Sequence, residues 1–410
     1  MGFVDFVFFF YMFVGLYMLS LFLFIYFPNR KLLFEDVKGK AEAVSIVVPC
    51  YNEEKHIGQT IDALLALEYP RDKIEIIVVD DKSSDGSASV VRGYARTHSN
   101  VRLIVNTRNS GGAAEPTNIG IRAARYAYIA VTDADSSPEK DALLKMIGFL
   151  QRDEKVAAVT CAVLSKQPRT FIQKLQAIEY AVIAFNRKLL DLVDAVYVTP
   201  GPFALYRKSA LVEVGLFDTK NLTQDIEIVW RLRSHGYRAR MCLSARVFST
   251  TPSRFKAWFK QRIRWNIGGT QTLLQYKSSL FQKGMLGAFI IPFFSFSLFL
   301  GLFGLSLFTY LWTRRFLVSY LSTKYSVYAN TAILRLGDLT YTPSVLNFFG
   351  AVLFLLGIWF TFLALGIMKQ HQFSRASIFS VFFYMLIYLM IYPFIMVTSV
   401  YKLARGTYSW

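Results

Sequence analysis

Four long stretches without a charged residue constrain this sequence more than any other feature. They are Phe6–Asn29, Gly284–Thr313, Leu339–Met368 and Ala376–Tyr401. Each exceeds the roughly 20 apolar residues that a helix needs to cross a hydrocarbon layer of about 30 Å. One such stretch is compatible with a buried helix of a soluble protein, but four of them predict an integral membrane protein. We therefore expect a multi-pass protein with one N-terminal span and about three C-terminal spans.

The first stretch is interpreted as a retained membrane anchor and not as a secretory signal. A signal peptide has a basic start, a shorter apolar part and a cleavage site of small residues. Here Asp5 precedes the stretch, and basic residues follow it at positions 30, 31, 38 and 40. Since positive charge accumulates on the cytoplasmic side of a membrane, the segment after the first span is expected in the cytoplasm, at the plasma membrane.

The segment Arg314–Asp338 conflicts with this orientation, because it is more basic than an outer loop should be. Two explanations are open. Either the stretch before it re-enters the membrane or kinks at Pro292, or the charge bias is weak at this point. Four spans remain the expectation.

The chain is strongly basic, with 46 Lys and Arg against 28 Asp and Glu and a net charge of +18. Lipid headgroups and cytoplasmic flanks explain most of this excess, so membrane lipids are the expected partner. No nucleic-acid recognition motif accompanies the charge, which argues against nucleic acid. The three cysteines, Cys50, Cys161 and Cys242, are too scattered for a disulfide framework or a zinc site. Catalysis is therefore expected to depend on carboxylates and basic groups.

Between the first two apolar stretches, β-branched segments alternate with helical patterns. The predicted strands are Val44–Val48, Ile74–Val79, Val101–Val105 and Tyr128–Val131, and the predicted helices are Lys55–Ala66, Ala88–Thr97 and Asn118–Tyr126. This alternation predicts an α/β domain with a doubly wound, mostly parallel sheet. Ligands of such sheets bind beyond the carboxyl ends of the strands, so the residues there are the candidates for function.

Carboxylates follow three of these strands. They lie in Pro49–Glu54, in Asp80–Ser87 and in Asp133–Asp135. Helix capping or a turn explains any one of these segments by itself. Their convergence on one edge of the sheet instead predicts a site for a hard cation, which in turn binds phosphate oxygens.

The order of these segments resembles the family 2 glycosyltransferases. The matching motifs are Pro-x-Tyr-Asn-Glu-Glu at 49–54, Asp-Asp-x-Ser-x-Asp-Gly-Ser at 80–87, Asn-x-Gly-Gly at 109–112 and Asp-x-Asp at 133–135. The likeness covers about residues 44–270 and implies an inverting enzyme with a nucleotide-sugar-binding domain of the GT-A fold. It implies that Pro49, Tyr51, Glu53 and Asp81 line the nucleoside pocket. It further implies that Asp133 contacts the nucleotide and that Asp135 holds Mg²⁺ or Mn²⁺ against the diphosphate.

A candidate base lies further along the chain, in Leu222–Glu227. Sugar transfer needs a group that removes the proton of the acceptor hydroxyl. The segment resembles the Thr-Glu-Asp motif of the family, whose aspartate is the base, and this assigns the role to Asp225. Gln224 departs from the motif, in which glutamate is usual. The alternative for Asp225 is a capping role on a helix Ile226–Ser234, although Thr223 is also able to cap it.

Gln261–Trp265 resembles the Gln-x-x-Arg-Trp motif of processive members such as cellulose, chitin and hyaluronan synthases. The resemblance implies that Arg264 neutralises the donor diphosphate, that Trp265 lies at the edge of the cleft and that Gln261 adds a hydrogen bond. The same residues also fit an amphipathic helix on the membrane surface within 253–283, and the two interpretations are compatible. Phe171–Leu192 is a second amphipathic candidate.

Gly201 lies in a segment, Thr199–Arg207, that resembles the small-residue segment through which the acceptor approaches in this family. A plain turn is the alternative. The segment Asn109–Asn118 departs from the family at three positions, namely Ala113, Pro116 and Thr117.

These observations predict a span at 1–29, a GT-A domain at 30–252, an interfacial region at 253–283 and a membrane region at 284–410. The expected activity is transfer of a sugar, with inversion, from a nucleotide donor (a UDP-sugar) to a saccharide or lipid-linked acceptor. Processive polysaccharide synthesis is one form of it. The alternatives are a non-processive transferase acting on a polyprenyl phosphate or glycolipid, similar to dolichol-phosphate mannose synthases, and a transporter or binding protein with an inactive domain.

Overall fold

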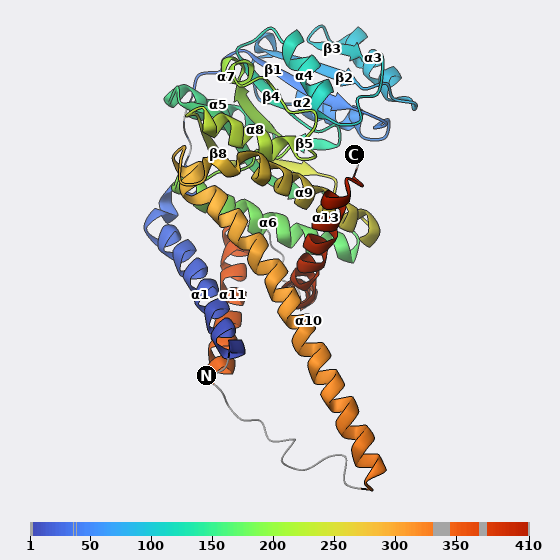
Figure 1. Cartoon of the computed structure of the whole chain (residues 1–410). Helices are drawn as coiled ribbons and strands as arrows, with labels where there is room; N and C mark the ends of the chain where they lie inside the picture. The colour runs from blue at the N-terminus through green and yellow to red at the C-terminus, as the bar shows by residue number, and fades with distance from the viewer. Residues whose placement is uncertain (1–2, 36, 38, 331–344, 369–374, 409–410) are drawn as a thin grey trace.

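The structure is a computed structural model that describes residues 3–35, 37, 39–330, 345–368 and 375–408. An α/β domain lies at one end, and long helices extend from it on one side (Figure 1). The first residues of the predicted apolar stretch Leu339–Met368 lie outside the described part of the chain.

The domain is built on one sheet of eight strands. The strands are β1 (Val44–Cys50), β2 (Ile74–Asp80), β3 (Val101–Val105), β4 (Tyr128–Val131), β5 (Ser136–Pro138), β6 (Val156–Ser165), β7 (Ala204–Arg207) and β8 (Arg238–Ser249). Their order across the sheet is β3-β2-β1-β4-β7-β6-β8-β5. The four predicted strands form one parallel half, in the order β3-β2-β1-β4. In the other half, β6 and β8 are parallel, whereas β7 and β5 run antiparallel to their neighbours.

Helices cover both faces of this sheet, which explains why β1 and β2 are buried along their whole length. The helices of the domain are α2 (Ile57–Leu65), α3 (Ser87–Thr97), α4 (Ala114–Ala123), α5 (Ala142–Arg152), α7 (Lys208–Glu213) and α8 (Gln224–Ser234). The predicted α/β fold is therefore confirmed.

Helix α4 begins four residues earlier than Asn118–Tyr126, the range that the sequence predicts, and also ends earlier. Pro116 falls in its first turn, where the missing N–H of proline interrupts no hydrogen bond. The side chain of Asn118 is used elsewhere: its Nδ2 donates to the carbonyl of Phe217 at 2.9 Å, and its Oδ1 accepts from the N–H of Phe217 at 2.9 Å.

Two long helices, α6 (Phe171–Leu192) and α9 (Phe255–Tyr276), lie between the domain and the helices that extend from it (Figure 1). The bounds of α6 match the predicted amphipathic segment. It begins with a reciprocal cap, in which Thr170 and Gln173 bond each other's backbone. Helix α9 carries the Gln261–Trp265 motif and lies within the predicted interfacial region.

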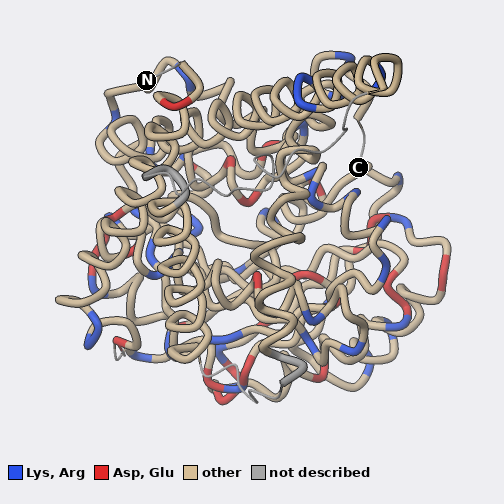
Figure 2. Tube along the Cα trace, turned by 90° about the horizontal axis from the view of Figure 1, so that it is seen from below, with Lys and Arg blue, Asp and Glu red and all other residues tan. Residues whose placement is uncertain are grey.

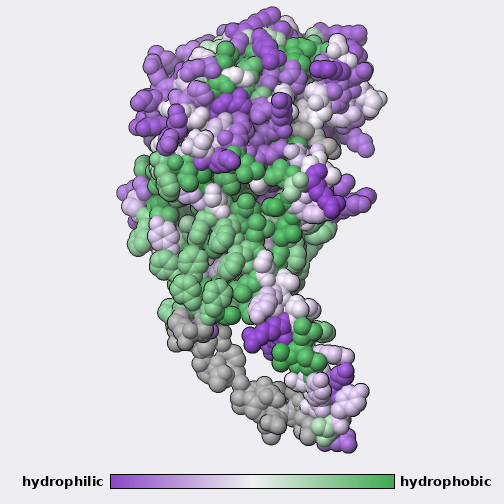
Figure 3. All heavy atoms as spheres, in the orientation of Figure 1, coloured by the Kyte–Doolittle hydropathy of each residue, from purple (hydrophilic) through white to green (hydrophobic). Residues whose placement is uncertain are grey.

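The helices that extend from the domain are α1 (Phe3–Asn29), α10 (Ile291–Tyr328), α11 (Val345–Ile367), α12 (Arg375–Phe383) and α13 (Tyr392–Arg405). In the described part of the chain, four helical segments are long and apolar enough to cross a membrane: Phe3–Leu32, Leu286–Tyr328, Phe348–Ile367 and Ile378–Arg405. They form an apolar surface below the polar domain (Figure 3). Seen from below, charged residues surround the coils of these helices, which are mostly uncharged (Figure 2).

Helix α10 resolves one question that the sequence left open. It is one continuous helix of 38 residues with Pro292 in its first turn, directly after a π-helical turn at Leu286–Ile290. The helix does not turn back after Pro292, so re-entry does not account for the basic residues that follow. At about 1.5 Å per residue it is roughly 57 Å long, well beyond the hydrocarbon thickness of about 30 Å. Arg314, Arg315 and Lys324 lie in the part of this helix that extends beyond that thickness.

The last of the four segments packs extensively against both α6 and α9, whereas α1 and α11 pack against α6 and α10 packs against α9, and it ends beside the domain (Figure 1). The ring of Phe383 lies 4.9 Å from that of Phe171 on α6. The Oγ of Ser399 donates to the carbonyl of Ile263 on α9 at 3.4 Å.

Candidate active site

A cavity of about 380 Å³ is enclosed by the carboxyl ends of the central strands together with α6, α8 and α9. It brings together every predicted site residue except Asp81. Those that line it are Pro49, Tyr51, Glu53, Asp133, Asp135, Gly201, Asp225, Gln261, Arg264 and Trp265.

The loop after β1 is held in place by the loop after β2. The N–H of Asn52 donates to Ser83 Oγ at 2.9 Å, and the N–H of Glu53 donates to Ser87 Oγ at 2.8 Å. Asn52 has a φ of 54°, a left-handed conformation that asparagine tolerates better than most residues. This backbone presents Tyr51 and Glu53 to the cavity.

Asp81 lies outside the cavity lining and is 2% exposed. Its carboxylate accepts from Asn106 Nδ2 at 2.8 Å, and from the N–H and Oγ of Ser110 at 2.8 and 2.7 Å. These bonds fix the segment that carries the Asn-x-Gly-Gly motif. A direct contact of Asp81 with a nucleoside stays a prediction.

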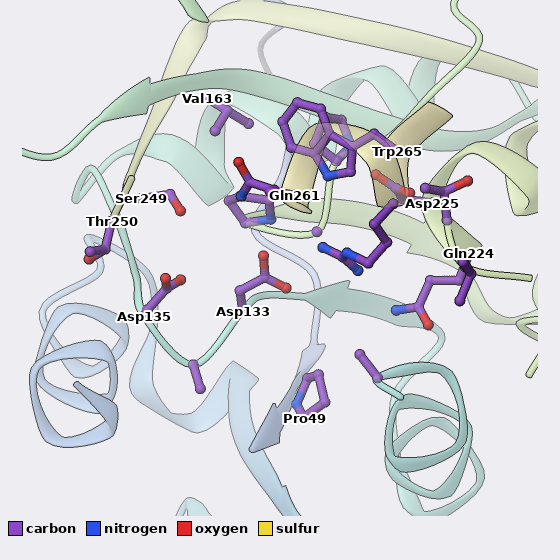
Figure 4. Close-up of a pocket in the computed structure, with 18 of the residues that line it drawn as sticks. Pro49, Asp133, Asp135, Val163, Gln224, Asp225, Ser249, Thr250, Gln261 and Trp265 are labelled. Atoms are coloured by element: carbon purple, nitrogen blue, oxygen red, sulfur yellow. The ribbon is translucent and has the colours of Figure 1, made fainter. Parts of the chain in front are cut away.

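Asp133 and Asp135 follow β4 and point into the same space (Figure 4). Their segment is fixed by Thr60 Oγ1, which donates to the carbonyl of Ala134 at 2.8 Å. Burial, followed by the negative charges of Asp135 and Asp225, raises the pKa of Asp133 to about 7, while Arg264 opposes the shift. Burial and the charge of Glu53 likewise raise the pKa of Asp135. The site therefore gathers negative charge that is only partly compensated.

This charge fits a divalent cation. Among the residues that the structure describes, no three His, Cys, Asp or Glu side chains are grouped as a complete metal site. Mg²⁺ and similar ions do not need one, since they are commonly held by one or two carboxylates together with water and substrate phosphates. Asp135, with Asp133 beside it, provides this arrangement.

Asp225 lies in the first turn of α8 and faces the cavity from the side opposite Asp135 (Figure 4). Thr223 occupies the N-cap position of α8 but its side chain makes no capping hydrogen bond, whereas Asp225 Oδ1 accepts from the N–H of Ile226 at 3.1 Å. Asp225 therefore bonds the backbone at the start of this helix and also lines the cavity. Burial raises the pKa of Asp225, and the charges of Arg264 and Arg187 oppose the shift. Gln224 lines the same cavity, and its Oε1 is buried with no hydrogen-bond partner among the described residues.

Helix α9 supplies Gln261, Arg264 and Trp265 from a single face. Burial lowers the pKa of Arg264, and the charges of Asp225 and Asp133 oppose the shift, so this guanidinium lies within the influence of both carboxylates. The helix also lies close to the start of α8: a Cβ on Gly268 would lie 2.2 Å from Thr223 Oγ1.

Helix α6 contributes three lining residues that the sequence did not identify: Tyr180, Ile183 and Arg187. Arg187 is 6% exposed, and its Nε has no hydrogen-bond partner among the described residues. The three positions have the i, i+3, i+7 spacing of one helical face. The sequence did contain one signal for this side of the cavity: Arg187 lies on the same helical face as the apolar Ile183. A cation on a face that becomes buried needs a partner of opposite charge.

Comparison with known sequences identifies the class of protein. The family described as "Glycosyltransferase like family 2" matches residues 41–268, more than half of the chain. The chain therefore belongs to this family, as its motifs predicted.

Particular relatives are poly-beta-1,6-N-acetyl-D-glucosamine synthases. That of Staphylococcus epidermidis is 32% identical and the match covers 65% of this chain and 64% of the relative. That of Staphylococcus aureus (strain COL) is 33% identical and the match covers 67% of each. The chain thus matches about two thirds of the length of these relatives.

A solved structure shows the same fold over nearly the whole chain. It is a mannosyltransferase from Pyrobaculum calidifontis in complex with GDP-Man and Mn²⁺, which is 19% identical, with a TM-score of 0.56. The match covers 95% of this chain and 96% of that one. The predicted GT-A fold is therefore confirmed, and the helices attached to it include four segments long and apolar enough to cross a membrane.

Proposed function

We propose that this chain is a membrane-bound transferase that moves a sugar, with inversion, from a UDP-sugar to a saccharide or lipid-linked acceptor. One observation carries the proposal: Asp133 and Asp225 face the same cavity, and Arg264 acts electrostatically on both. The cavity thus combines a place for a diphosphate with a buried carboxylate able to act as a base. The sequence similarity to poly-beta-1,6-N-acetyl-D-glucosamine synthases supports a growing polysaccharide as the acceptor. It also makes UDP-N-acetylglucosamine the first donor to test.

On the donor side, Pro49, Tyr51 and Glu53 hold the nucleoside and Asp133 contacts the nucleotide. Asp135 would hold Mg²⁺ or Mn²⁺, which neutralises diphosphate charge when bound. Arg264 supplies fixed positive charge where the leaving diphosphate gains negative charge, in a cavity that restricts water. Arginine suits this position, because its planar fork binds two phosphate oxygens at once.

On the acceptor side, Asp225 takes the proton of the attacking hydroxyl. The hydroxyl oxygen then bonds to the anomeric carbon as the bond to the diphosphate breaks, and the configuration at this carbon inverts. Gly201 leaves room beside Asp133, whereas Gln261 and Trp265 border the cavity from α9. We assign Gly201, Gln261 and Trp265 to orienting the acceptor and the adjacent edge of the bound nucleotide.

The domain organisation follows from the same proposal. Residues 30–252 form the catalytic domain on the cytoplasmic side of the plasma membrane, and 253–283 form its interfacial region. Residues 1–29 and 284–410 form the membrane region, which the four long apolar helical segments support.

The test uses the full chain in lipid nanodiscs with a panel of UDP- and GDP-sugars and Mn²⁺. We expect transfer from a UDP-sugar, with products sized by electrophoresis. Asp225→Asn should bind donor as the unmodified protein does but lose transfer by about 100-fold or more, because only the base is removed. Asp72→Asn, which makes the same change at an exposed acid outside the cavity, should retain activity.

The products decide between the forms of this activity. A long polymer supports processive synthesis, whereas a single sugar on a lipid supports the polyprenyl-phosphate or glycolipid alternative. Full turnover by Asp225→Asn would refute the assigned base. Absence of binding for every donor would refute the transferase function itself.

A further inference from the structure

A buried ion pair joins the two interfacial helices beside the cavity. Arg262 of α9 and Glu179 of α6 have side chains that are 1% and 3% exposed, and Nη2 of Arg262 lies 2.5 Å from Oε2 of Glu179. Removing two charges from water is costly, so such a pair needs further hydrogen bonds to its remaining polar atoms.

Two tyrosines of the last apolar segment supply those bonds. The hydroxyl of Tyr388 donates to Glu179 Oε2 at 2.7 Å, and the hydroxyl of Tyr392 donates to Glu179 Oε1. The Nε of Arg262 donates to the hydroxyl of Tyr392 at 3.1 Å. The carboxylate of Glu179 therefore connects α6 with α9 and with the last apolar segment, Ile378–Arg405.

Arg262 also contacts two residues that line the cavity. Its guanidinium carbon lies 4.0 Å from the centroid of the Trp265 ring, and its Nη1 donates to Gln261 Oε1 at 2.7 Å. Arg262 itself does not line the cavity. The orientation of Gln261 and Trp265 thus depends on a guanidinium that is held from outside the site.

The last segment contacts the interfacial helices on both sides of this cluster. Phe383 packs on Phe171 of α6, and Ser399 Oγ donates to the carbonyl of Ile263 on α9. The ring of Tyr388 also lies 4.7 Å from that of Trp258, which is fully buried. The segment therefore has an extended interface with the helix that carries the catalytic motif.

We propose that Glu179, Arg262, Tyr388 and Tyr392 form a positioning cluster through which the last apolar segment holds Gln261 and Trp265 in their working orientation. The segment then supports the active site in addition to anchoring the chain. This inference rests on the proposed transferase function, and the four residues are positioning residues that need not touch substrate.

The test is the double variant Tyr388→Phe, Tyr392→Phe in the full chain, in lipid nanodiscs. It removes two hydroxyls and retains both rings and the ion pair, so the fold is expected to persist. We expect the kcat for transfer to fall about tenfold, because small displacements of positioning groups are costly to rate. Donor affinity, measured by calorimetry with UDP, should change less than about twofold, since Pro49, Asp133 and Arg264 are untouched.

The matched control is Tyr384→Phe. Tyr384 lies one turn before Tyr388 and is 5% exposed, whereas the side-chain hydrogen bonds described for the Glu179 carboxylate come from Arg262, Tyr388 and Tyr392. It should leave kcat unchanged. A purely structural role would lower the unfolding temperature of the double variant without changing the kcat of the folded fraction, and that result would overturn the proposal.

A second measurement does not depend on activity. The native cysteines are all buried, so a cysteine introduced by Gln261→Cys reports on the cavity face of α9. Its rate of alkylation should rise several-fold when Tyr388→Phe and Tyr392→Phe are added, and not with Tyr384→Phe. An unchanged rate would overturn the positioning role, whereas a changed rate together with no transfer by the unmodified protein would refute only the proposed function.

Discussion

A Cβ on Gly201 would lie 2.6 Å from Oδ1 of Asp133 and 2.9 Å from Oδ2. Non-bonded atoms do not approach so closely, so the backbone at Gly201 fits directly against the carboxylate assigned to the nucleotide. Gly201 is not among the described glycines with positive φ. Glycine is therefore required here because there is no room for a side chain beside Asp133, and not because the backbone conformation is unusual.

Gly201→Ala is expected to displace the Asp133 carboxylate and weaken UDP-sugar binding by about tenfold or more. Titration calorimetry with UDP measures this change. The control is Gly93→Ala on α3, where a Cβ would meet nothing within 4 Å. This control should bind UDP normally and gain about 0.5–1 kcal/mol of stability, because alanine is the better helix residue. Unchanged UDP affinity in Gly201→Ala would show that the carboxylate moves freely.

The sequence was sufficient to predict one side of the cavity. Pro49 lies at the carboxyl end of β1 and Asp133 and Asp135 follow β4, and the ends of these parallel strands meet at one edge. The strands β5, β6, β7 and β8 were not predicted, and the antiparallel pairings of β7 depend on contacts far apart in the chain. Such pairing is decided by tertiary packing, which local patterns do not encode.

The other side of the cavity shows a different limit of sequence reasoning. Arg187 comes from a helix that was assigned only to the membrane surface, because amphipathic spacing does not tell a cavity from a lipid interface. The polar cluster at Glu179 was equally hidden, since its members are up to 213 residues apart. Asp81 shows the converse, because a matching motif does not establish whether the side chain faces the ligand.

Asp135→Asn is expected to weaken Mn²⁺-dependent donor binding by about tenfold or more. The physical reason is that a hard cation prefers a charged oxygen, and the charge of Glu53 beside Asp135 is favourable only when the cation is present. Electron paramagnetic resonance of Mn²⁺, with and without UDP, measures the binding. Asp72→Asn provides the control with equal loss of charge. Equal Mn²⁺ affinity in both variants would remove Asp135 from the metal site.

We expect the protonation of Asp225 to appear in the pH dependence of transfer. Burial raises the pKa of this carboxyl above its ordinary value of 3.8. A base acts only when deprotonated, so kcat/KM should fall as the pH falls through this raised pKa. The decline should therefore begin at a higher pH than an exposed aspartate would give. Asp225→Asn should lose the part of this limb that Asp225 causes, whereas the titration of Asp133, whose pKa is raised to about 7, should remain.

Arg187→Met should move that acid limb to higher pH. The charge of Arg187 lowers the pKa of Asp225, so its removal leaves the carboxyl harder to deprotonate. Activity at about pH 6 should then fall more than activity at about pH 8, relative to the unmodified protein. Arg187→Lys retains the charge and should shift the limb less. A limb that moves to lower pH, or does not move, would show that Arg187 does not act on Asp225.

The stability of the domain should depend on Asp191, near the end of α6. Its Oδ2 lies 2.8 Å from Lys188 Nζ and its Oδ1 lies 2.7 Å from Arg240 Nε, and the Lys188 and Asp191 side chains are 1% and 0% exposed. Asp191→Asn leaves a buried lysine without its counter-charge, which is expected to cost about 3–5 kcal/mol.

The control for this prediction is Asp141→Asn, which breaks an ion pair with Lys145 whose side chains are 41% and 26% exposed. An exposed pair is worth about 0–1 kcal/mol, because water already solvates both charges. Denaturant unfolding measures both variants, and the kcat of the folded fraction should stay within about twofold of the unmodified protein, since neither residue lines the cavity. Equal losses of stability would mean that burial does not distinguish the two pairs.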